Sequence, residues 1–233
     1  MGVMTLTLLD APDSTVNAQH SEATAMKVLI IGTGNMGRGI ATRALAGKNT
    51  VTFHDQDAAK AQALAAELGA AVAGDTRDAI SAADVVVFAT PYQASLDVAR
   101  RLGPALEHKV VVDISNPLDE TYTGLVTAPG TSAAEEIRKL LPPSVKLVKA
   151  FNTTFAGTLV AGQPLDVFIA GDDDAAKAKV AELVKSGGLN AIDVGALERA
   201  RQLEGLGLLG ITLQFRLNTG FATAWKLVLP AAA

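Results

Sequence analysis

Three glycines at the spacing G-x-G-x-x-G form the arrangement in this chain that most clearly predicts a chemical task. They lie in the run Gly32-Thr33-Gly34-Asn35-Met36-Gly37, which follows an apolar stretch at 28–31 and leads into an alanine-rich stretch. In this motif the first glycine permits a tight turn, the second lets backbone amides approach a pyrophosphate, and the third lets a helix pack against a strand. The N-terminus of that helix adds unpaired N–H groups and a partial positive charge. The six residues are therefore predicted to bind the phosphates of a dinucleotide.

An acidic residue, Asp55, follows a second apolar stretch at 51–54. A carboxylate about twenty residues beyond the glycines accepts hydrogen bonds from the free ribose diol of NAD(H) and repels the 2′-phosphate of NADP(H). Asp55 thus favours NAD(H), with Gln56 beside it as a further cofactor contact. Lys60 lies one helical turn further on, where it is either a phosphate ligand or a solvated surface lysine. The choice between NAD and NADP stays open.

Residues that could act as acids or bases are few. Alcohol and hydroxyacid dehydrogenases need a positioned proton carrier for the oxygen, but His20, His54 and His108 are each expected to be structural or solvated. Tyr92 is the hydroxyl at a strand end that could donate a proton, although a pocket wall is the commoner role for such a residue. The chain has no cysteine, which excludes thiol catalysis and cysteine-bound metals.

A run of three aspartates, Asp172-Asp173-Asp174, invites a metal interpretation. We prefer to interpret it as the cap of a following helix, because acidic residues there accept hydrogen bonds from the free N–H groups and complement the helix dipole. No histidine or glutamate cluster has metal-ligand spacing, so no metal site is predicted.

Strand-like and helix-like stretches alternate along the chain, which indicates an α/β protein with a doubly wound parallel sheet of the Rossmann type. The apolar run at 84–89 is continuous, as expected of a strand buried on both faces, and the next strand is expected at 109–114. Further strands are expected at 28–31, 51–54, 71–73, 145–150, 166–170 and 190–194. Helices are expected after the glycines and at 58–68, 75–82, 93–106, 133–141 and 174–186.

The predicted organisation has three parts: an N-terminal arm at 1–25, a dinucleotide-binding domain at 26–196 and a C-terminal helical cap at 197–233. The cap contains two apolar helical segments, roughly 198–213 and 219–228. These segments are too apolar for a free surface, so they must cover the sheet edge, the substrate crevice or a second subunit.

Ligands of open α/β sheets bind beyond the carboxyl ends of the strands, where the strand order reverses. The glycine turn and Asp55 would hold the phosphates and the adenosine, and the ends of three later strands would surround the nicotinamide and the substrate. Those later residues are Ala89, Thr90, Pro91, Asn116, Pro117, Phe151 and Asn152. Of these, Asn152 joins Tyr92 as a candidate catalytic residue.

The composition limits which classes of partner the protein could bind. The net charge of −4 provides no basic footprint for nucleic acid. No apolar run approaches the eighteen or more residues that would span a membrane. Hydrophobic residues make up 49% of the chain, which is ample for a core. We expect a soluble, cytoplasmic protein.

Four motifs together resemble one enzyme family. They are Ile31–Gly37, Asp113-Ile114-Ser115-Asn116-Pro117-Leu118, Val148-Lys149-Ala150-Phe151-Asn152-Thr153, and Ala170-Gly171-Asp172-Asp173 followed by Ala191–Gly195. On these the chain resembles the deazaflavin:NADP oxidoreductase family over about residues 27–200. It is similar also to the cytosolic domain of six-transmembrane metalloreductases.

The resemblance implies hydride transfer between a nicotinamide cofactor and a deazaflavin or flavin ring. Such a ring disperses the arriving charge, which is compatible with the few acids and bases of this chain. Family members also pair through their C-terminal segments, so the resemblance implies a homodimer. NADP-using members typically carry a serine–arginine pair where this chain has Asp55-Gln56, and only Lys60 matches.

Two other functions stay open at this point. One is a small carbonyl or imine reductase with Tyr92 as proton donor. The other is a regulatory protein that binds the nucleotide without a reaction.

Overall fold

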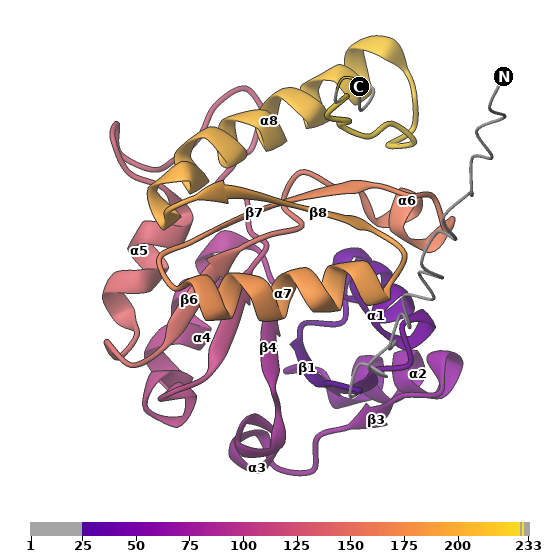
Figure 1. Ribbon diagram of the computed structural model, residues 1–233, viewed down its shortest axis with the longest axis vertical. Coiled ribbons are helices and arrows are strands. Elements are labelled where there is room, and N and C mark those ends of the chain that lie inside the picture. Colours follow the sequence, from indigo (N-terminus) through magenta and orange to yellow (C-terminus); the bar gives the residue numbers. More distant parts are fainter. Residues whose placement is uncertain (1–24, 229, 231–233) are drawn as a thin grey trace, which may run out of the picture.

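A mostly parallel eight-stranded sheet flanked by helices forms the fold of the computed structural model, which describes residues 25–228 and 230 (Figure 1). The strand order is β3-β2-β1-β4-β5-β6-β7-β8. The strands are β1 Lys27–Ile31, β2 Thr50–His54, β3 Ala71–Val72, β4 Val85–Phe88, β5 Val110–Asp113, β6 Lys146–Lys149, β7 Asp166–Gly171 and β8 Asn190–Gly195. The α-helices are α1 Asn35–Ala46, α2 Ala58–Leu68, α3 Thr76–Ala82, α4 Tyr92–Leu102, α5 Ala133–Leu140, α6 Ala156–Val160, α7 Asp174–Ser186 and α8 Ala200–Leu217. Two short 3₁₀ segments are Gly103–Leu106 and Leu197–Arg199.

The sheet is parallel from β3 to β6, and the predicted doubly wound Rossmann architecture is confirmed there. The sheet departs from the parallel arrangement at one pair of strands, because β7 runs antiparallel to β6, and β8 then runs parallel to β7. The connection explains the reversal. Residues 150–165 connect the two strands, and their one helix, α6, has five residues and is only about 7.5 Å long, so no helix returns the chain along the sheet as in the usual parallel crossover.

The central strands are buried on both faces. All four residues of β4 are buried, which matches the continuous apolar run in the sequence. One apolar cluster packs side chains of α1, α2, α6 and α7 against the sheet. A second cluster packs α3, α4 and α5 against the opposite face. Helices on both faces hold the strand ends at fixed positions.

The described part of the C-terminal segment, residues 197–228, contains one α-helix rather than the two predicted helices. The helix α8 ends at Leu217, and the second helix predicted at 219–228 is absent from the described residues. Left-handed backbone at Asn218 (φ 52°) and Phe221 (φ 61°) stops the helix. The predicted arm at 1–25 lies outside the described residues except for Ala25. Within the described chain, no helix has the length and apolar content that crossing a membrane requires.

A buried arginine, Arg43, fixes α1 against its neighbours. Its guanidinium donates to the carbonyl oxygens of Leu159 at 2.6 Å, Gln163 at 2.6 Å and Gly187 at 3.2 Å. These carbonyls lie in or just beyond α6 and after α7, where the helix leaves its last carbonyls unpaired. Arg43 therefore holds the helix that follows the glycine turn in its place.

Replacing Arg43 by Met should lower the free energy of unfolding by about 3 kcal/mol, since the substitution leaves several buried carbonyls without a donor. Arg38→Met is the matched control on the same helix, because the Arg38 pair with Glu67 is exposed and such pairs contribute about 0–1 kcal/mol. Urea denaturation of both variants measures the difference. Equal midpoints for the two variants would contradict this role of Arg43.

Candidate functional site

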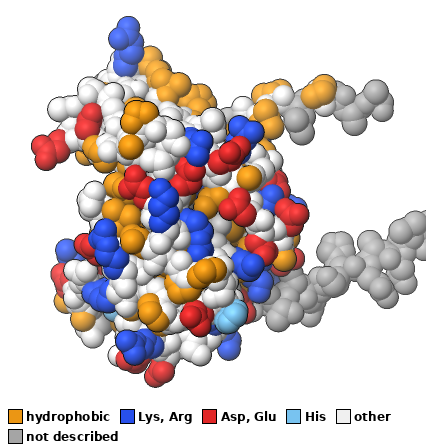
Figure 2. Space-filling model, turned by 90° about the vertical axis from the view of Figure 1, so that its left-hand side faces the viewer, with side chains coloured by type: hydrophobic (Ala, Val, Ile, Leu, Met, Phe, Trp, Pro, Cys, Tyr) orange, Lys and Arg blue, Asp and Glu red, His pale blue; other side chains and the backbone are white. Residues whose placement is uncertain are grey.

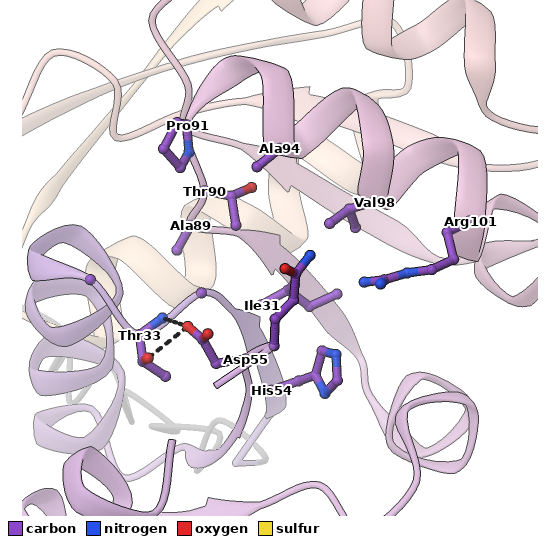
Figure 3. Close-up of a pocket in the computed structure, with 13 residues that line it drawn as sticks. Ile31, Thr33, His54, Asp55, Ala89, Thr90, Pro91, Ala94, Val98 and Arg101 are labelled. Atoms are coloured by element: carbon purple, nitrogen blue, oxygen red, sulfur yellow. Dashed lines mark hydrogen bonds between the residues drawn. The ribbon is translucent and has the colours of Figure 1, made fainter. Parts of the chain in front are cut away.

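A cavity of about 260 Å³ lies at the carboxyl ends of β1, β2 and β4, where the strand order reverses (Figure 3). This is the place where open α/β sheets bind their ligands. The cavity is lined by Ile31, Gly32, Thr33, Gly34, His54, Asp55, Gln56, Ala89, Thr90, Pro91, Ala94, Val98 and Arg101. The predicted nucleotide residues at the first two strand ends and at Ala89–Pro91 are thus brought together.

The glycines of the turn have distinct structural tasks. Gly32 has φ +107°, and a Cβ there would lie 2.4 Å from the carbonyl oxygen of Ala89. A Cβ on Gly37 would lie 2.2 Å from the carbonyl oxygen of Gly32, so α1 packs against the turn only without a side chain. A Cβ on Gly34 would meet nothing within 4 Å. Gly34 is also the N-cap of α1 and makes no side-chain cap, so the N–H groups of the first turn stay available for an anion.

Asp55 is held by the protein itself. Its Oδ2 accepts hydrogen bonds from the Thr33 backbone N–H at 2.8 Å and the Thr33 hydroxyl at 2.7 Å, and its Oδ1 accepts one from the Asp57 N–H at 3.0 Å. Burial alone would raise the pKa of Asp55, but these hydrogen bonds outweigh it and hold that pKa below its usual range. A carboxylate accepts about four hydrogen bonds. Three are used within the chain, which leaves one for a ribose hydroxyl.

Several predicted cofactor residues lie outside the cavity. The Lys60 side chain is 73% exposed and pairs with Asp57 at 3.6 Å. Asn35 and Met36 begin α1, beyond the open face of the turn. Asn116, Pro117 and Phe151 belong to the neighbouring strand ends of β5 and β6 and do not line this cavity.

Three lining residues on α4 were missed by sequence reasoning. They are Ala94, Val98 and Arg101. Their spacing could have predicted them. They follow Pro91, at the start of α4, at steps of three, four and three residues, and this spacing places all four on one face of a helix.

Asn116 and Asn152 interlock at the ends of β5 and β6. The Asn116 amide donates to the Asn152 backbone oxygen at 2.8 Å, and the Asn152 amide donates to Asn116 Oδ1 at 3.0 Å and to the Leu203 carbonyl of α8 at 2.8 Å. A Cβ on Gly207 would lie 2.6 Å from Asn116 Oδ1, so α8 approaches this pair closely. Three buried polar atoms here make no hydrogen bond in the described chain: Ser115 Oγ, Asn152 Oδ1 and Thr153 Oγ1. Such atoms call for a partner.

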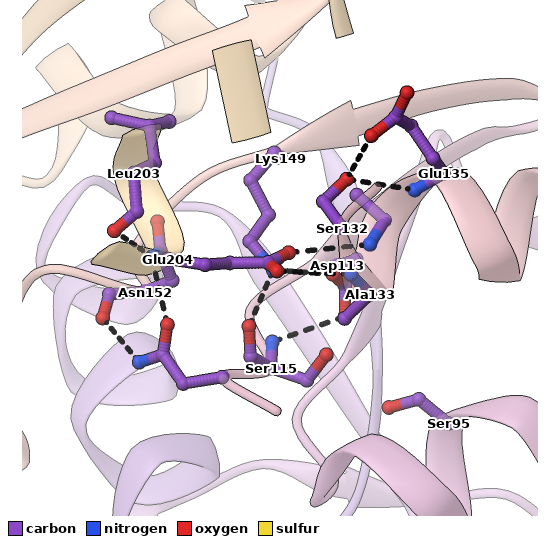
Figure 4. Close-up of polar contacts among 12 residues, drawn as sticks. Ser95, Asp113, Ser115, Ser132, Ala133, Glu135, Lys149, Asn152, Leu203 and Glu204 are labelled. Carbon is purple, nitrogen blue, oxygen red and sulfur yellow. Dashed lines mark hydrogen bonds and ion pairs between the residues drawn. The ribbon is translucent and has the colours of Figure 1, made fainter. Parts of the chain in front are cut away.

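A buried ionic cluster lies beside the asparagine pair (Figure 4). The Lys149 ammonium is 2.7 Å from Asp113 Oδ2 and 3.0 Å from Glu204 Oε1, and all three side chains are fully buried. Lys149 also donates to the Ser115 carbonyl. Glu204 accepts hydrogen bonds from the N–H groups of Ala133 at 2.9 Å and Ala134 at 3.3 Å, at the start of α5. The cluster joins β5, β6, α5 and α8.

Charge balance governs the pKa values in this cluster. Burial alone would lower the pKa of Lys149, but the two carboxylates outweigh it and raise that pKa. Burial raises the pKa of Glu204, because the charge of Lys149 offsets only part of that effect and Asp113 adds a second negative charge. The N-terminus of α5 offsets part of the remaining negative charge.

Tyr92 points away from the cavity. Its side chain is 8% exposed and belongs to the apolar cluster of α4 and α5, and its hydroxyl donates to the Glu136 carboxylate on α5. Burial first, and then Glu136, raise the pKa of Tyr92 far above its ordinary value. The Tyr92 hydroxyl is therefore engaged by Glu136, and Tyr92 does not line the cavity.

The aspartate run caps a helix, as predicted. Asp173 is the N-cap of α7 and accepts a hydrogen bond from the Ala176 N–H at 2.9 Å. Asp172 accepts one from the Leu197 N–H at 2.9 Å. Asp174 forms an ion pair with Lys177 at 3.0 Å.

The fold and the open glycine turn define the class: this is a dinucleotide-binding protein with a Rossmann sheet. The family model for coenzyme F420-dependent NADP oxidoreductases matches residues 27–117. The F420-dependent NADP reductase of Methanocaldococcus jannaschii is 31% identical over 82% of this chain and 94% of its own length. The chain belongs to this family. Membership makes it an NADP-dependent oxidoreductase.

Other relatives agree with this placement. The crystal structure of a proposed F420-dependent NADP reductase from Arthrobacter sp. FB24 superposes with a TM-score of 0.75 at 30% identity, covering 84% of this chain and 97% of that one. The metalloreductase STEAP3 of Rattus norvegicus is 30% identical over 79% of this chain but only 37% of its own length. Both resemblances predicted from the sequence motifs are confirmed.

Replacing Gly34 by Asp should lower the affinity for NADPH about 100-fold or more, because it places a carboxylate beside the predicted pyrophosphate position. The fold should persist, since the position has room for a side chain and Asp is a favoured N-cap. Gly34→Asn is the matched neutral control and should lose much less affinity for NADPH. Calorimetric titration with NADPH measures affinity, and thermal melting checks the fold. Wild-type affinity in the Asp variant would show that the phosphates bind elsewhere.

Replacing Lys149 by Met should lower the free energy of unfolding by about 3–5 kcal/mol, since it leaves two buried carboxylates without their cation. Adding Glu204→Gln should restore part of that loss. Burial raises the pKa of Glu204, and the loss of the Lys149 charge would raise it further above its unfolded value, so the Met variant should recover stability as pH falls towards the unfolded value of a carboxyl. Urea denaturation over a range of pH measures this. A double variant no more stable than the single one would contradict the cluster's role.

Proposed function

We propose that this chain transfers a hydride between NADP(H) and a deazaflavin. The observation that carries the proposal is the match to F420-dependent NADP reductases, which extends over 94% of the Methanocaldococcus jannaschii enzyme. The match includes the strand ends where the nicotinamide is expected, so it covers more than the common glycine motif.

The site supports a dinucleotide through its own geometry. The open face at Gly34 and the uncapped N-terminus of α1 fit a pyrophosphate. The adenosine would lie along the end of β2, beside Asp55 and Gln56. The nicotinamide would then reach the ends of β4, β5 and β6.

At the nicotinamide end the chain binds and orients rather than exchanges protons. Bound NADP(H) supplies the hydride. Thr90 and Pro91 line the cavity and would form one wall, and Asn116, which Asn152 holds in place at the end of β5, would form another. Holding the two rings in line and excluding water are the contributions we assign to these residues.

A carbonyl or imine reductase with Tyr92 as proton donor has less support, because the Tyr92 hydroxyl is buried against Glu136 and does not line the cavity.

Asp55 supports a preference for NAD(H) less strongly than its position in the sequence suggested. Three of its acceptor positions are used by Thr33 and Asp57, so it cannot bind a ribose diol through both oxygens freely.

We also propose that the protein is a cytoplasmic homodimer. Large apolar side chains are exposed on α8 and nearby, namely Tyr122, Leu209, Phe215, Leu217 and Phe221. Phe215 packs with Tyr122 and Phe221 at ring separations of 5.8 and 5.6 Å. Elsewhere, on the face seen in Figure 2, acidic and basic side chains are interspersed, so an apolar partner surface is better supported than a charged one.

Mixing the protein with NADPH and an oxidised deazaflavin should bleach both absorbances together, and flavin mononucleotide should react more slowly. Tyr92→Phe should keep the rate within about threefold, whereas loss of a true proton donor costs about 10²–10⁴-fold. Stopped-flow absorbance measures both. Tight NADPH binding without reaction with either acceptor would favour the regulatory function instead.

A further inference from the structure

Arg101 extends from α4 into the nucleotide cavity (Figure 3). It lies three residues beyond Val98 on the cavity-facing side of that helix, and its guanidinium points towards the end of β2, where His54 and Asp55 are found. The pKa of His54 is lowered by burial and then by the charge of Arg101, which places that charge close to the β2 end.

We propose that Arg101 binds the 2′-phosphate of NADP(H) and so sets the preference for the phosphorylated nucleotide. This rests on the proposed function, because it assigns a residue to the adenosine end of the same site. The residue directly after Asp55 at the end of β2 is Gln56, which carries no charge, so Arg101 supplies the positive charge at this end of the cavity.

The charges of the cavity support this assignment. Among its described lining residues Arg101 is the one fixed cation, and it forms no ion pair or hydrogen bond with any other described residue. An arginine left unpaired beside a cavity is available for a ligand anion, and its planar fork matches a phosphate through two parallel hydrogen bonds.

The other charges nearby are already engaged. Asp55 is bound by Thr33 and Asp57, which fixes its carboxylate on the side of the glycine turn. Lys60 is largely exposed and pairs with Asp57, which itself caps α2. Because these groups are already bonded within the protein, Arg101 provides the positive charge that a 2′-phosphate would meet in the cavity.

A competing role for Arg101 is contact with the adenine ring. Ala94 and Val98 form an apolar wall next to it, and a guanidinium can stack on an aromatic face. That role would affect every adenine nucleotide equally. The 2′-phosphate role affects only the nucleotides that carry this group, which makes the two separable.

The test is a calorimetric titration of 2′,5′-ADP and of ADP into wild type and two variants. Arg101→Gln should lower the affinity for 2′,5′-ADP by about 10- to 100-fold and that for ADP by less than about threefold. The control is Arg100→Gln on the same helix, because Arg100 pairs with Asp97 at 2.8 Å and lies outside the cavity. Both affinities should stay unchanged in that control.

Two results would overturn the proposal. If Arg101→Gln loses affinity equally for both nucleotides, Arg101 contacts the adenine ring instead. If the variant loses affinity for neither, another group such as Lys60 binds the 2′-phosphate. Hydride transfer is measured separately, by deazaflavin reduction at saturating NADPH. If wild type shows no such transfer but Arg101→Gln still loses 2′,5′-ADP selectively, the proposed reaction fails and the assignment of Arg101 holds. If transfer is normal but the variant loses both nucleotides equally, the reaction holds and the assignment of Arg101 fails.

Discussion

The buried ammonium of Lys149 is the interaction on which the rest of the site depends. It meets two carboxylates, Asp113 from β5 and Glu204 from α8, in a region without solvent. Separating such charges leaves at least one of them buried without a partner, at a cost of several kcal/mol. The cluster therefore fixes α8 over the ends of β5 and β6. Through the Ser115 carbonyl it also fixes the start of the loop that carries Asn116.

The two halves of the site are built on different principles. The adenosine half depends on the absence of side chains, since Gly32 and Gly37 allow contacts that a Cβ would block. The nicotinamide half depends on polar side chains locked by one another, with the Asn116–Asn152 pair under α8. Both halves lie at the carboxyl ends of neighbouring strands in one sheet. A nucleotide bound at the turn consequently extends towards the strand ends that the ionic cluster holds in place.

Local patterns in the sequence predicted the elements well, because turn and cap chemistry acts within a few residues. The glycine turn and the Asp173 cap are both present. Contacts between distant segments could not be predicted in this way. Glu204 lies far along the chain from Lys149, and nothing in the spacing links them. Similarly, the reversal of β7 depends on how far α6 can carry the chain, and the direction of Tyr92 depends on Glu136 of another helix.

A crystal structure of the chain with NADP(H) bound tests the central claim most directly. We predict pyrophosphate oxygens within hydrogen-bond distance of the backbone N–H groups at Gly34 and Asn35. We also predict the nicotinamide at the ends of β4 and β5, beside Thr90 and Asn116. A nucleotide bound with its nicotinamide at the end of β2, or away from the glycine turn altogether, would contradict this model of the site.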